Sequence, residues 1–180
     1  SLGGKGAFIG KVRDDQLGTV FRHDMQSIGV EFVTPAASEG PATGSCLVLI
    51  TPDAQRTMCT NLGAASHLTP ADIGKETIQS AEVVYMEGYL FDPPGAQAAF
   101  VEAADAAHDA GHKVSITLSD PFCVDRHRRA FQMLVADHTD ILFGNEEEIK
   151  SLYQVDDFDA ALQHVRGHCE IACLTRGNKG

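Results

Sequence analysis

Basic residues are scarce in this sequence. Lys and Arg number 14 against 25 Asp and Glu, which gives a formal net charge of −11. A surface that binds nucleic acid needs clustered basic side chains to meet the phosphates, so this balance argues against a nucleic-acid partner. It leaves a nucleotide ligand open, because glycine amides and one or two basic groups are enough to hold phosphates locally.

Long hydrophobic runs are also missing, and no stretch approaches the length needed to cross a bilayer. These residues contain no secretory signal. The five cysteines are odd in number and form no disulfide-like framework. Reduced thiols in a cytoplasmic protein without a membrane partner are the simplest interpretation.

What the sequence does contain is an alternation of short apolar strands and helical segments, in a chain of 180 residues that is long enough for one domain with a substantial core. Strands are expected at 7–12, 83–90, 113–118, 140–143 and 171–175, and helices at 15–28, 95–110, 124–137, from 145 onward and at 157–166. Connections of this length predict right-handed βαβ crossovers and a parallel sheet with helices on both faces.

Residues 43–60 break this alternation. Two β-prone runs flank Thr51-Pro52-Asp53-Ala54, a sequence typical of a hairpin turn. We expect an antiparallel excursion from the main sheet. A lid over a ligand site is one hypothesis for it, and an ordinary edge hairpin is the alternative.

In a parallel sheet, ligands bind beyond the carboxyl ends of the strands. Three informative stretches fall at such ends: EGYLFDPP (87–94), LSDPF (118–122) and FGNEEE (143–148). The three consecutive glutamates have a simple explanation, because acidic groups in the first turn of a helix are favoured by the helix dipole. A site that handles a cation and a phosphate is the sharper hypothesis, and the position at a strand end favours it.

Several of these stretches resemble the ribokinase-type (PfkB) carbohydrate and nucleoside kinases. GGKGAFIGKVRDDQLG (3–18) carries their G-x-V-x-x-D-x-x-G pattern, DILFGNEEEI (140–149) carries their N-x-x-E motif at Asn145 and Glu148, and LTRGNKG (174–180) is similar to the start of their nucleotide pocket. The resemblance implies one ribokinase-like α/β domain over 1–180. Its fold would be a three-layer αβα arrangement with a mostly parallel central sheet and small antiparallel lid strands inserted at about 30–60.

Within this family the likeness is strongest to the adenosine kinases. TGSCLVLITPDAQRTMCTNLGAA (43–65) resembles their lid strands, including an arginine at Arg56, and LSDPFCVDRHRRAF (118–131) resembles the loop that supplies an aromatic ring to the adenine base. On that match Phe122 and Arg56 bind the substrate. The alternative for Phe122 is a core side chain after a proline turn, and the alternative for Arg56 is a surface salt bridge.

The resemblance implies transfer of the γ-phosphoryl group of ATP to the 5′-hydroxyl of a nucleoside, most simply adenosine to AMP. Mg²⁺ prefers oxygen ligands and keeps several waters, so Glu148 would hold it through water while Asn145 orients water or phosphate. Helix capping alone is the alternative for Glu148. Thr175 and Gly177 match positions near the nucleotide phosphates, and Arg176 between them either meets a phosphate or faces solvent.

The family's substrate-binding Gly-Gly motif and its catalytic aspartate have no counterpart in these residues. We expect the base aspartate beyond Gly180 and interpret the chain as an internal part of a longer kinase, so these residues alone should not phosphorylate adenosine. Two alternatives stay open: a ribokinase or fructokinase-type sugar kinase, and a non-catalytic ribokinase-fold protein that binds a nucleoside.

Overall fold

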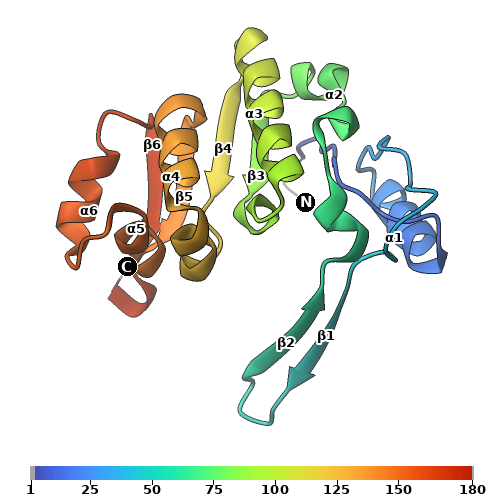
Figure 1. The fold of residues 1–180 in the computed structure, drawn as a ribbon, viewed down its shortest axis with the longest axis horizontal. Helices are drawn as coiled ribbons and strands as arrows, with labels where there is room; N and C mark the ends of the chain where they lie inside the picture. Colours follow the sequence, from blue (N-terminus) through green and yellow to red (C-terminus); the bar gives the residue numbers. More distant parts are fainter. Residues whose placement is uncertain (1–2, 180) are drawn as a thin grey trace. The chain divides into compact units, whose positions relative to one another are not determined.

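The computed structural model describes residues 3–179. The chain divides into two compact units, residues 1–74 and 75–180. Figure 1 shows the first unit in blue to green and the second in green to red. Among the described residues, no helix combines the length and apolar character that a bilayer span requires.

The second unit is built on four parallel strands in the order β3-β4-β5-β6, as Figure 1 shows. The strands are β3 (Val83–Glu87), β4 (Lys113–Thr117), β5 (Ile141–Asn145) and β6 (Ile171–Thr175). The helices are α2 (Lys75–Gln79), α3 (Pro94–Asp109), α4 (Pro121–His138), α5 (Glu146–Tyr153) and α6 (Phe158–Val165), with short 3₁₀ turns η3 (Gly88–Phe91) and η4 (Gly177–Lys179). The expected α/β class with a parallel sheet is confirmed.

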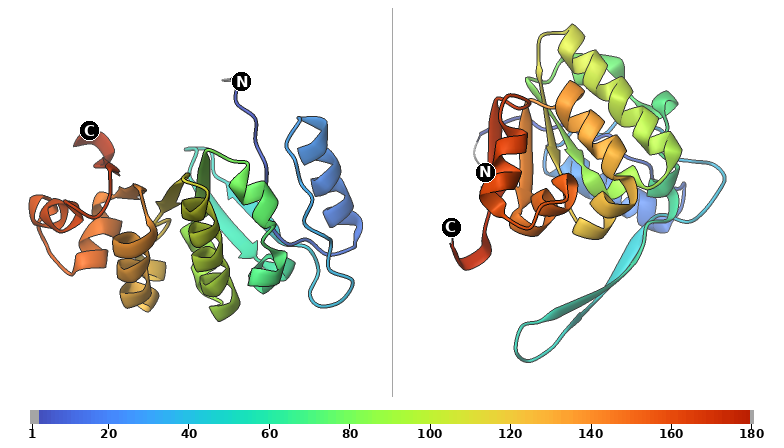
Figure 2. Two further views of the ribbon diagram at one scale, coloured as in Figure 1. Left: turned by 90° about the horizontal axis from the view of Figure 1, so that it is seen from above. Right: turned by 60° about the vertical axis from the view of Figure 1, so that its left-hand side comes forward.

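One face of this sheet forms the core of the second unit. α3 packs against β3 and β4, and α5 against β5 and β6; Figure 2 shows α3 and α4 side by side along the sheet. Five strand residues on this face are buried: Val84, Met86, Val114, Ile116 and Leu142. Side chains on alternate residues point to the opposite face, and several of these are exposed: Val83, Tyr85, Phe143 and Ile171.

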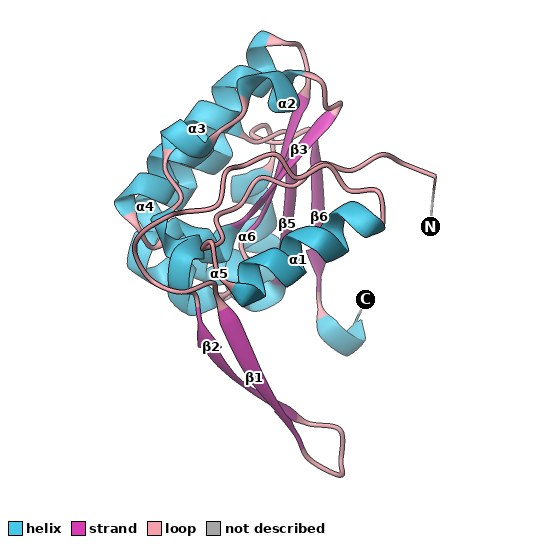
Figure 3. Ribbon diagram, turned by 90° about the vertical axis from the view of Figure 1, so that its right-hand side faces the viewer, coloured by secondary structure: helices cyan, strands magenta, loops and turns pink. Residues whose placement is uncertain are grey.

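Among its described residues, the first unit holds one α-helix and one hairpin, which Figure 3 shows in cyan and magenta. Its elements are α1 (Gln16–Ser27), β1 (Ser45–Ile50), β2 (Arg56–Asn61) and the 3₁₀ turns η1 (Gly63–His67) and η2 (Pro70–Asp72). The strands β1 and β2 pair antiparallel in register Ser45 to Asn61. The predicted turn is present, because Thr51 N donates to Gln55 O and Ala54 adopts a φ of 63°. The excursion is therefore a regular hairpin.

Asp15 ties α1 to the segment that enters the hairpin. As N-cap of α1, its Oδ1 accepts hydrogen bonds from Gly18 N at 2.8 Å and from Thr43 Oγ1 at 2.7 Å, and its Oδ2 accepts from Thr43 N at 2.9 Å. Hydrogen bonding to the Thr43 backbone is the largest cause that lowers the pKa of Asp15. A Cβ on Gly18 would lie 2.0 Å from the Arg13 carbonyl oxygen, so only glycine fits there. The aspartate and the last glycine of the G-x-V-x-x-D-x-x-G pattern thus have a structural explanation.

Several sequence-based bounds were wrong. The strand predicted over 83–90 ends at Glu87, because residues 88–91 form the 3₁₀ turn η3. The strand predicted over 7–12 is an extended segment joined to residues 31–37 by isolated bridges only, at Ala7 and Arg13, because the two segments come within hydrogen-bonding distance only near their ends. Helix α4 begins at Pro121 instead of residue 124. Proline is favoured in the first turn of a helix, where its missing N–H costs nothing, and Asp120 caps that turn.

Candidate functional site

The carboxyl ends of the four parallel strands form one edge of the second unit, and the stretches singled out from the sequence meet there. The register pairs Glu87 with Thr117, Thr117 with Phe143, and Asn145 with Thr175. Each strand leads into a turn at this edge. These turns are η3 after β3, Ser119–Phe122 after β4, Asn145–Glu148 after β5 and Thr175–Gly177 after β6. The structure therefore brings Phe122, Asn145, Glu148 and Thr175 to the same edge of the sheet.

Asn145 and Glu148 form a reciprocal capping box at the start of α5. Glu148 N donates to Asn145 Oδ1 at 2.9 Å, Asn145 N donates to Glu148 Oε2 at 2.9 Å, and Asn145 Nδ2 donates to Glu148 Oε1 at 2.6 Å. The other two glutamates pair with cations: Glu147 lies 2.8 Å from Lys150, and Glu146 lies 3.5 Å from Arg176. The negative run thus caps a helix, and only Glu148 turns inward.

The negative charge of the Glu148 carboxylate is destabilised at this position. The residue is 5% exposed, and burial is the main cause that raises the pKa of its carboxyl, with repulsion from Asp120 and Glu87 adding to the rise against the hydrogen bond from the Asn145 backbone. Glu87 ends β3 and Asp120 follows β4, so three carboxylates gather at the ends of three adjacent strands. A bound cation would offset this repulsion.

Phe122 projects from the first turn of α4 and is 75% exposed. Its neighbours Cys123 and Val124 are buried, which turns the ring away from the core. Asp120 fixes the turn, because its Oδ1 accepts from Phe122 N at 2.8 Å and from Cys123 N at 3.1 Å. Phe122 is therefore not a core side chain, and its ring is free to meet a ligand.

The turn that leads into Phe122 is strained. Asp120 N donates to Leu118 O at 2.8 Å, which closes a three-residue turn around Ser119, and Ser119 adopts a φ of 67°. Such γ-turns are rare because the central residue is held in an unfavourable conformation. Ser119 Oγ donates to Glu87, and this bond joins the ends of β3 and β4. Strain of this kind is concentrated at functional sites.

Beyond β6, the chain turns through Thr175, Arg176 and Gly177. Thr175 and Gly177 are exposed, and Gly177 adopts a φ of 58° with nothing within 4 Å of the position a Cβ would take. The guanidinium of Arg176 lies over the ring of Phe158 at 4.3 Å, and its Nε is 3.5 Å from Glu146 without a hydrogen bond. Arg176 is thus held against α5 and α6 in this structure.

A family model for pfkB carbohydrate kinases matches residues 1–180. The chain belongs to the pfkB family. Among solved structures, an adenosine kinase from Sinorhizobium meliloti is 42% identical and superposes with a TM-score of 0.92 over 99% of this pfkB chain and 55% of that one. A probable sugar kinase from Rhizobium etli CFN 42 is 43% identical, with the same TM-score and coverage.

Curated relatives of this pfkB chain are more distant. A fructokinase-2 from Solanum lycopersicum is 26% identical over 99% of this chain and 57% of its own length. An ATP-dependent ribose-1-phosphate kinase from Halopiger xanaduensis is 29% identical over 91% of this chain and 54% of its own. The chain thus spans about half the length of the relatives it matches. The predicted ribokinase-like fold and family are confirmed.

A structure of a ribokinase II from E. coli, 20% identical, holds ATP and Mg²⁺. The residues of the pfkB chain fit such an ion only indirectly. In the described part of the chain, no group of three or more His, Cys, Asp or Glu side chains could enclose a metal. Both Glu148 oxygens already accept bonds from Asn145. Since Mg²⁺ binds through one or two carboxylates and keeps its waters, Glu148 suits contact through water.

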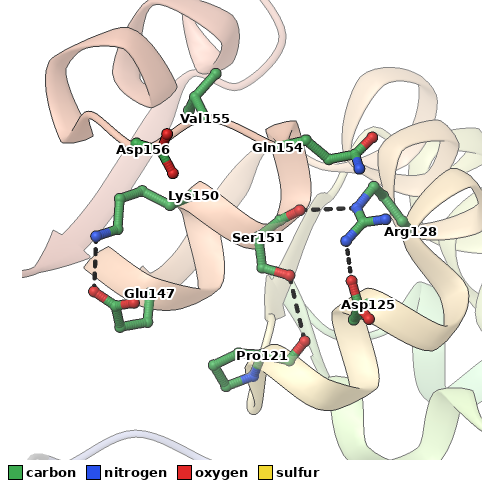
Figure 4. Close-up of a pocket in the computed structure, with 9 residues that line it drawn as sticks. All are labelled: Pro121, Asp125, Arg128, Glu147, Lys150, Ser151, Gln154, Val155 and Asp156. Atoms are coloured by element: carbon green, nitrogen blue, oxygen red, sulfur yellow. Dashed lines mark hydrogen bonds and ion pairs between the residues drawn. The ribbon is translucent and has the colours of Figure 1, made fainter.

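A pocket of about 480 Å³ lies near this edge, between α4 and α5, and Figure 4 shows its lining. Pro121 and Glu147 border it, but none of the predicted site residues lines it. Its two cations are paired internally, since Arg128 contacts Asp125 and Lys150 contacts Glu147. The pocket is therefore a gap between helices, and the candidate site is the strand edge beside it.

Arg56 belongs to the first unit of the pfkB chain. It begins β2, opposite Ile50, and is exposed. Its predicted contact with the substrate stays a prediction. The sequence alone assigned no site role to Glu87, Tyr89 or Asp120. Their position at or just after the ends of strands β3 and β4 was the signal available. Burial, followed by repulsion from Asp120, Glu148 and Glu87, raises the pKa of Tyr89.

Proposed function

We propose that the complete protein transfers the γ-phosphoryl group of ATP to the 5′-hydroxyl of a nucleoside, with adenosine as the first candidate. The observation that carries this proposal is the exposed ring of Phe122 at the strand edge that also holds Asn145 and Glu148. An aromatic side chain left in water at a ligand-binding edge is suited to stack on a base. The 42% identity to the adenosine kinase of S. meliloti supports the same substrate.

Each predicted residue has a role in this proposal. Phe122 stacks on the base, where a face-on aromatic contact contributes about 1 kcal/mol beyond the area it buries. Asn145 donates through its amide to phosphate or water. Thr175 and Gly177 let the nucleotide phosphates approach the backbone closely, and Arg176 is drawn to them once it leaves Glu146. Arg56 meets the substrate or the phosphates from the hairpin.

Phosphoryl transfer depends on in-line positioning and on stabilisation of negative charge spread over the phosphate oxygens. When bound, Mg²⁺ supplies part of that stabilisation. Glu148 would hold it through water, and the acidic surroundings of Glu148 favour a cation. A general base must reach the hydroxyl that it deprotonates, and none of the described residues is assigned to that task.

A sugar kinase is the second candidate, because several relatives are fructokinases and the 43% identical structure is named a probable sugar kinase. A bare sugar has no base for Phe122 to stack on. The two candidates therefore differ in what Phe122 contributes. A third outcome, nucleoside binding without catalysis, is separated from both by the absence of ATP turnover.

Isothermal titration calorimetry of the complete protein distinguishes these cases. We expect binding of adenosine and much weaker binding of ribose and fructose, and Mg²⁺-dependent formation of AMP. Phe122→Ala should weaken adenosine binding about tenfold, because stacking and its buried area are lost. Met133→Ala is the control, since Met133 is 56% exposed on the same helix, eleven residues from Phe122. Full adenosine affinity in Phe122→Ala would remove the reason for preferring a nucleoside.

A further inference from the structure

Helix α4 is broken at one residue. His127 has φ −122° and ψ 23°, which is outside the helical range, inside a helix that otherwise runs from Pro121 to His138. The break separates a short segment, 121–126, from a longer one, 128–138. The longer segment is anchored in the core by the buried side chains of Phe131, Leu134 and Val135. The short segment carries Phe122.

The carboxylate of Asp92, at the end of η3, contacts the residues at this break. Asp92 is the C-cap of η3. Its Oδ1 accepts a hydrogen bond from Arg126 Nε at 3.1 Å, and its Oδ2 accepts one from Arg126 Nη2 at 2.9 Å. His127 Nε2 lies 2.7 Å from Asp92 Oδ1. Asp92 therefore binds the last residue of the short segment and the residue at the break together. The Arg126 guanidinium, and to a smaller extent His127, lowers the pKa of Asp92 against the effect of burial, so the carboxylate is charged at neutral pH.

The imidazole of His127 is fixed on its other side as well. Gln97 Nε2 lies 3.4 Å from His127 Nδ1 and also donates to Phe91 O at 2.8 Å. The ring of Phe91 meets His127 edge-on, with centroids 6.2 Å apart. A proton on Nε2 donated to Asp92 leaves Nδ1 to accept from Gln97, which satisfies both nitrogens. The ring therefore has one preferred orientation at the break.

The start of the short segment is braced against α5. Ser151 Oγ donates to Pro121 O at 3.4 Å, a bond that Figure 4 shows. Cys123 and Val124 also anchor this segment in the core, where they are 1% and 0% exposed. The two-pronged ion pair with Asp92 adds a constraint at the end of the segment next to the break, because bidentate arginine–carboxylate pairs fix geometry as well as distance.

We propose that Asp92 is a positioning residue for substrate binding, which sets the angle of the segment 121–126 and so the place of the Phe122 ring. This inference rests on the proposed function, in which Phe122 stacks on a base. Five residues separate Phe122 from His127, which is about 7.5 Å along a helix. A tilt of about 10° at the break therefore moves Phe122 by about 1.3 Å, and misplacement of about 1 Å can reduce a rate on the order of a hundredfold.

If Asp92 contributed only to overall stability, its replacement would have the same effect as the loss of another surface carboxylate that pairs with α4. Asp92 is 41% exposed, as is typical of surface pairs that contribute little to folding. The control is Asp105→Ala, because Asp105 pairs with His138 at the other end of α4, 3.3 Å apart. Both variants remove a carboxylate that meets a histidine of α4, but only Asp92 acts on the segment that carries Phe122.

The experiment uses the complete protein with 4-fluorophenylalanine placed at position 122 and read by ¹⁹F NMR without ligand. We expect Asp92→Ala to shift or broaden the resonance, Asp92→Asn to do so less, and Asp105→Ala to leave it unchanged. An unchanged resonance in Asp92→Ala would overturn the proposal. This readout needs no activity, so it decides the positioning role even if the protein phosphorylates no nucleoside.

Steady-state kinetics supply the second readout. Asp92→Ala should raise KM for adenosine about fivefold or more and leave KM for ATP within about twofold, because only the Phe122 segment moves. In a Phe122→Ala background the same change should raise KM no further. An equal rise in that background would show that Asp92 does not act through Phe122 and would refute the inference.

Discussion

Replacing Glu148 by alanine separates its capping role from its proposed role toward a cation. The variant loses two hydrogen bonds, from Asn145 N at 2.9 Å and from Asn145 Nδ2 at 2.6 Å. Each such bond stabilises a fold by about 1 kcal/mol net, or somewhat more to a charged acceptor. Removal of a buried carboxylate with a raised pKa offsets part of this loss.

The expected net loss is about 1–2 kcal/mol, within the range of about 0.5–2 kcal/mol measured for helix caps replaced by alanine. In a domain of 150–250 residues this lowers Tm by about 2–8 °C. Asn145→Ala is the matched variant, because it breaks the same box from the other side and leaves the Glu148 carboxylate in place. Both variants should lose similar stability in denaturant titrations without Mg²⁺.

The two variants should differ in activity. We expect Glu148→Ala to raise the Mg²⁺ concentration for half-maximal activity by about tenfold or more, and Asn145→Ala to raise KM for ATP with little change in Mg²⁺ dependence. Equal Mg²⁺ dependence in the two variants would mean that Glu148 only caps the helix. Unchanged stability in both would contradict the capping box itself.

The pH dependence has a definite sign. Because the pKa of Glu148 is higher in the folded protein than its ordinary value of 4.5, the folded state holds this proton more tightly than the unfolded chain. Its contribution to the free energy of unfolding is then full below pH 4.5 and is lost as pH rises through the folded pKa. The stability difference between wild type and Glu148→Ala should therefore be larger near pH 5 than at pH 7 in metal-free buffer.

Two further substitutions test local geometry. Asp15→Asn should lower stability at pH 7, since an amide cannot accept from Thr43 and Gly18 on both sides; because the pKa of Asp15 is lowered from 3.8, the deficit should shrink as pH falls below 3.8, as urea midpoints would show. Ser119→Gly should be about 1 kcal/mol more stable than Ser119→Ala, because both lose the bond to Glu87 but only alanine keeps the strain of a positive φ. Equal midpoints for the two would argue against strain at this turn.

Periodicity and end signals located most elements. Helix α1 falls within one residue of its predicted limits, because Asp15 caps it and Gly29, with φ 83°, ends it. The strand IACLT was placed at its observed bounds. The position of the site followed from the same alternation, since parallel strands bring their carboxyl ends to one edge.

Features that depend on tertiary contacts were not visible in the sequence. Pro121 was interpreted as part of a turn, whereas Asp120 makes it the first residue of α4. Nothing local marks the break at His127, and the carboxylate that contacts it belongs to Asp92, 35 residues away. The exposure of Phe122 also could not be predicted, because a phenylalanine after Asp120-Pro121 is equally compatible with a buried core side chain.

The hairpin β1–β2 has a consequence for dynamics. Every residue of both strands is exposed, so the pair is held by its own ladder with almost no buried apolar area, and two strands alone are marginal in water. Its backbone amides should exchange with deuterium through local opening at a small fraction of the global free energy, long before those of β4. Such opening would leave the hydrogen bonds of the parallel sheet in place, because the hairpin and that sheet belong to different compact units.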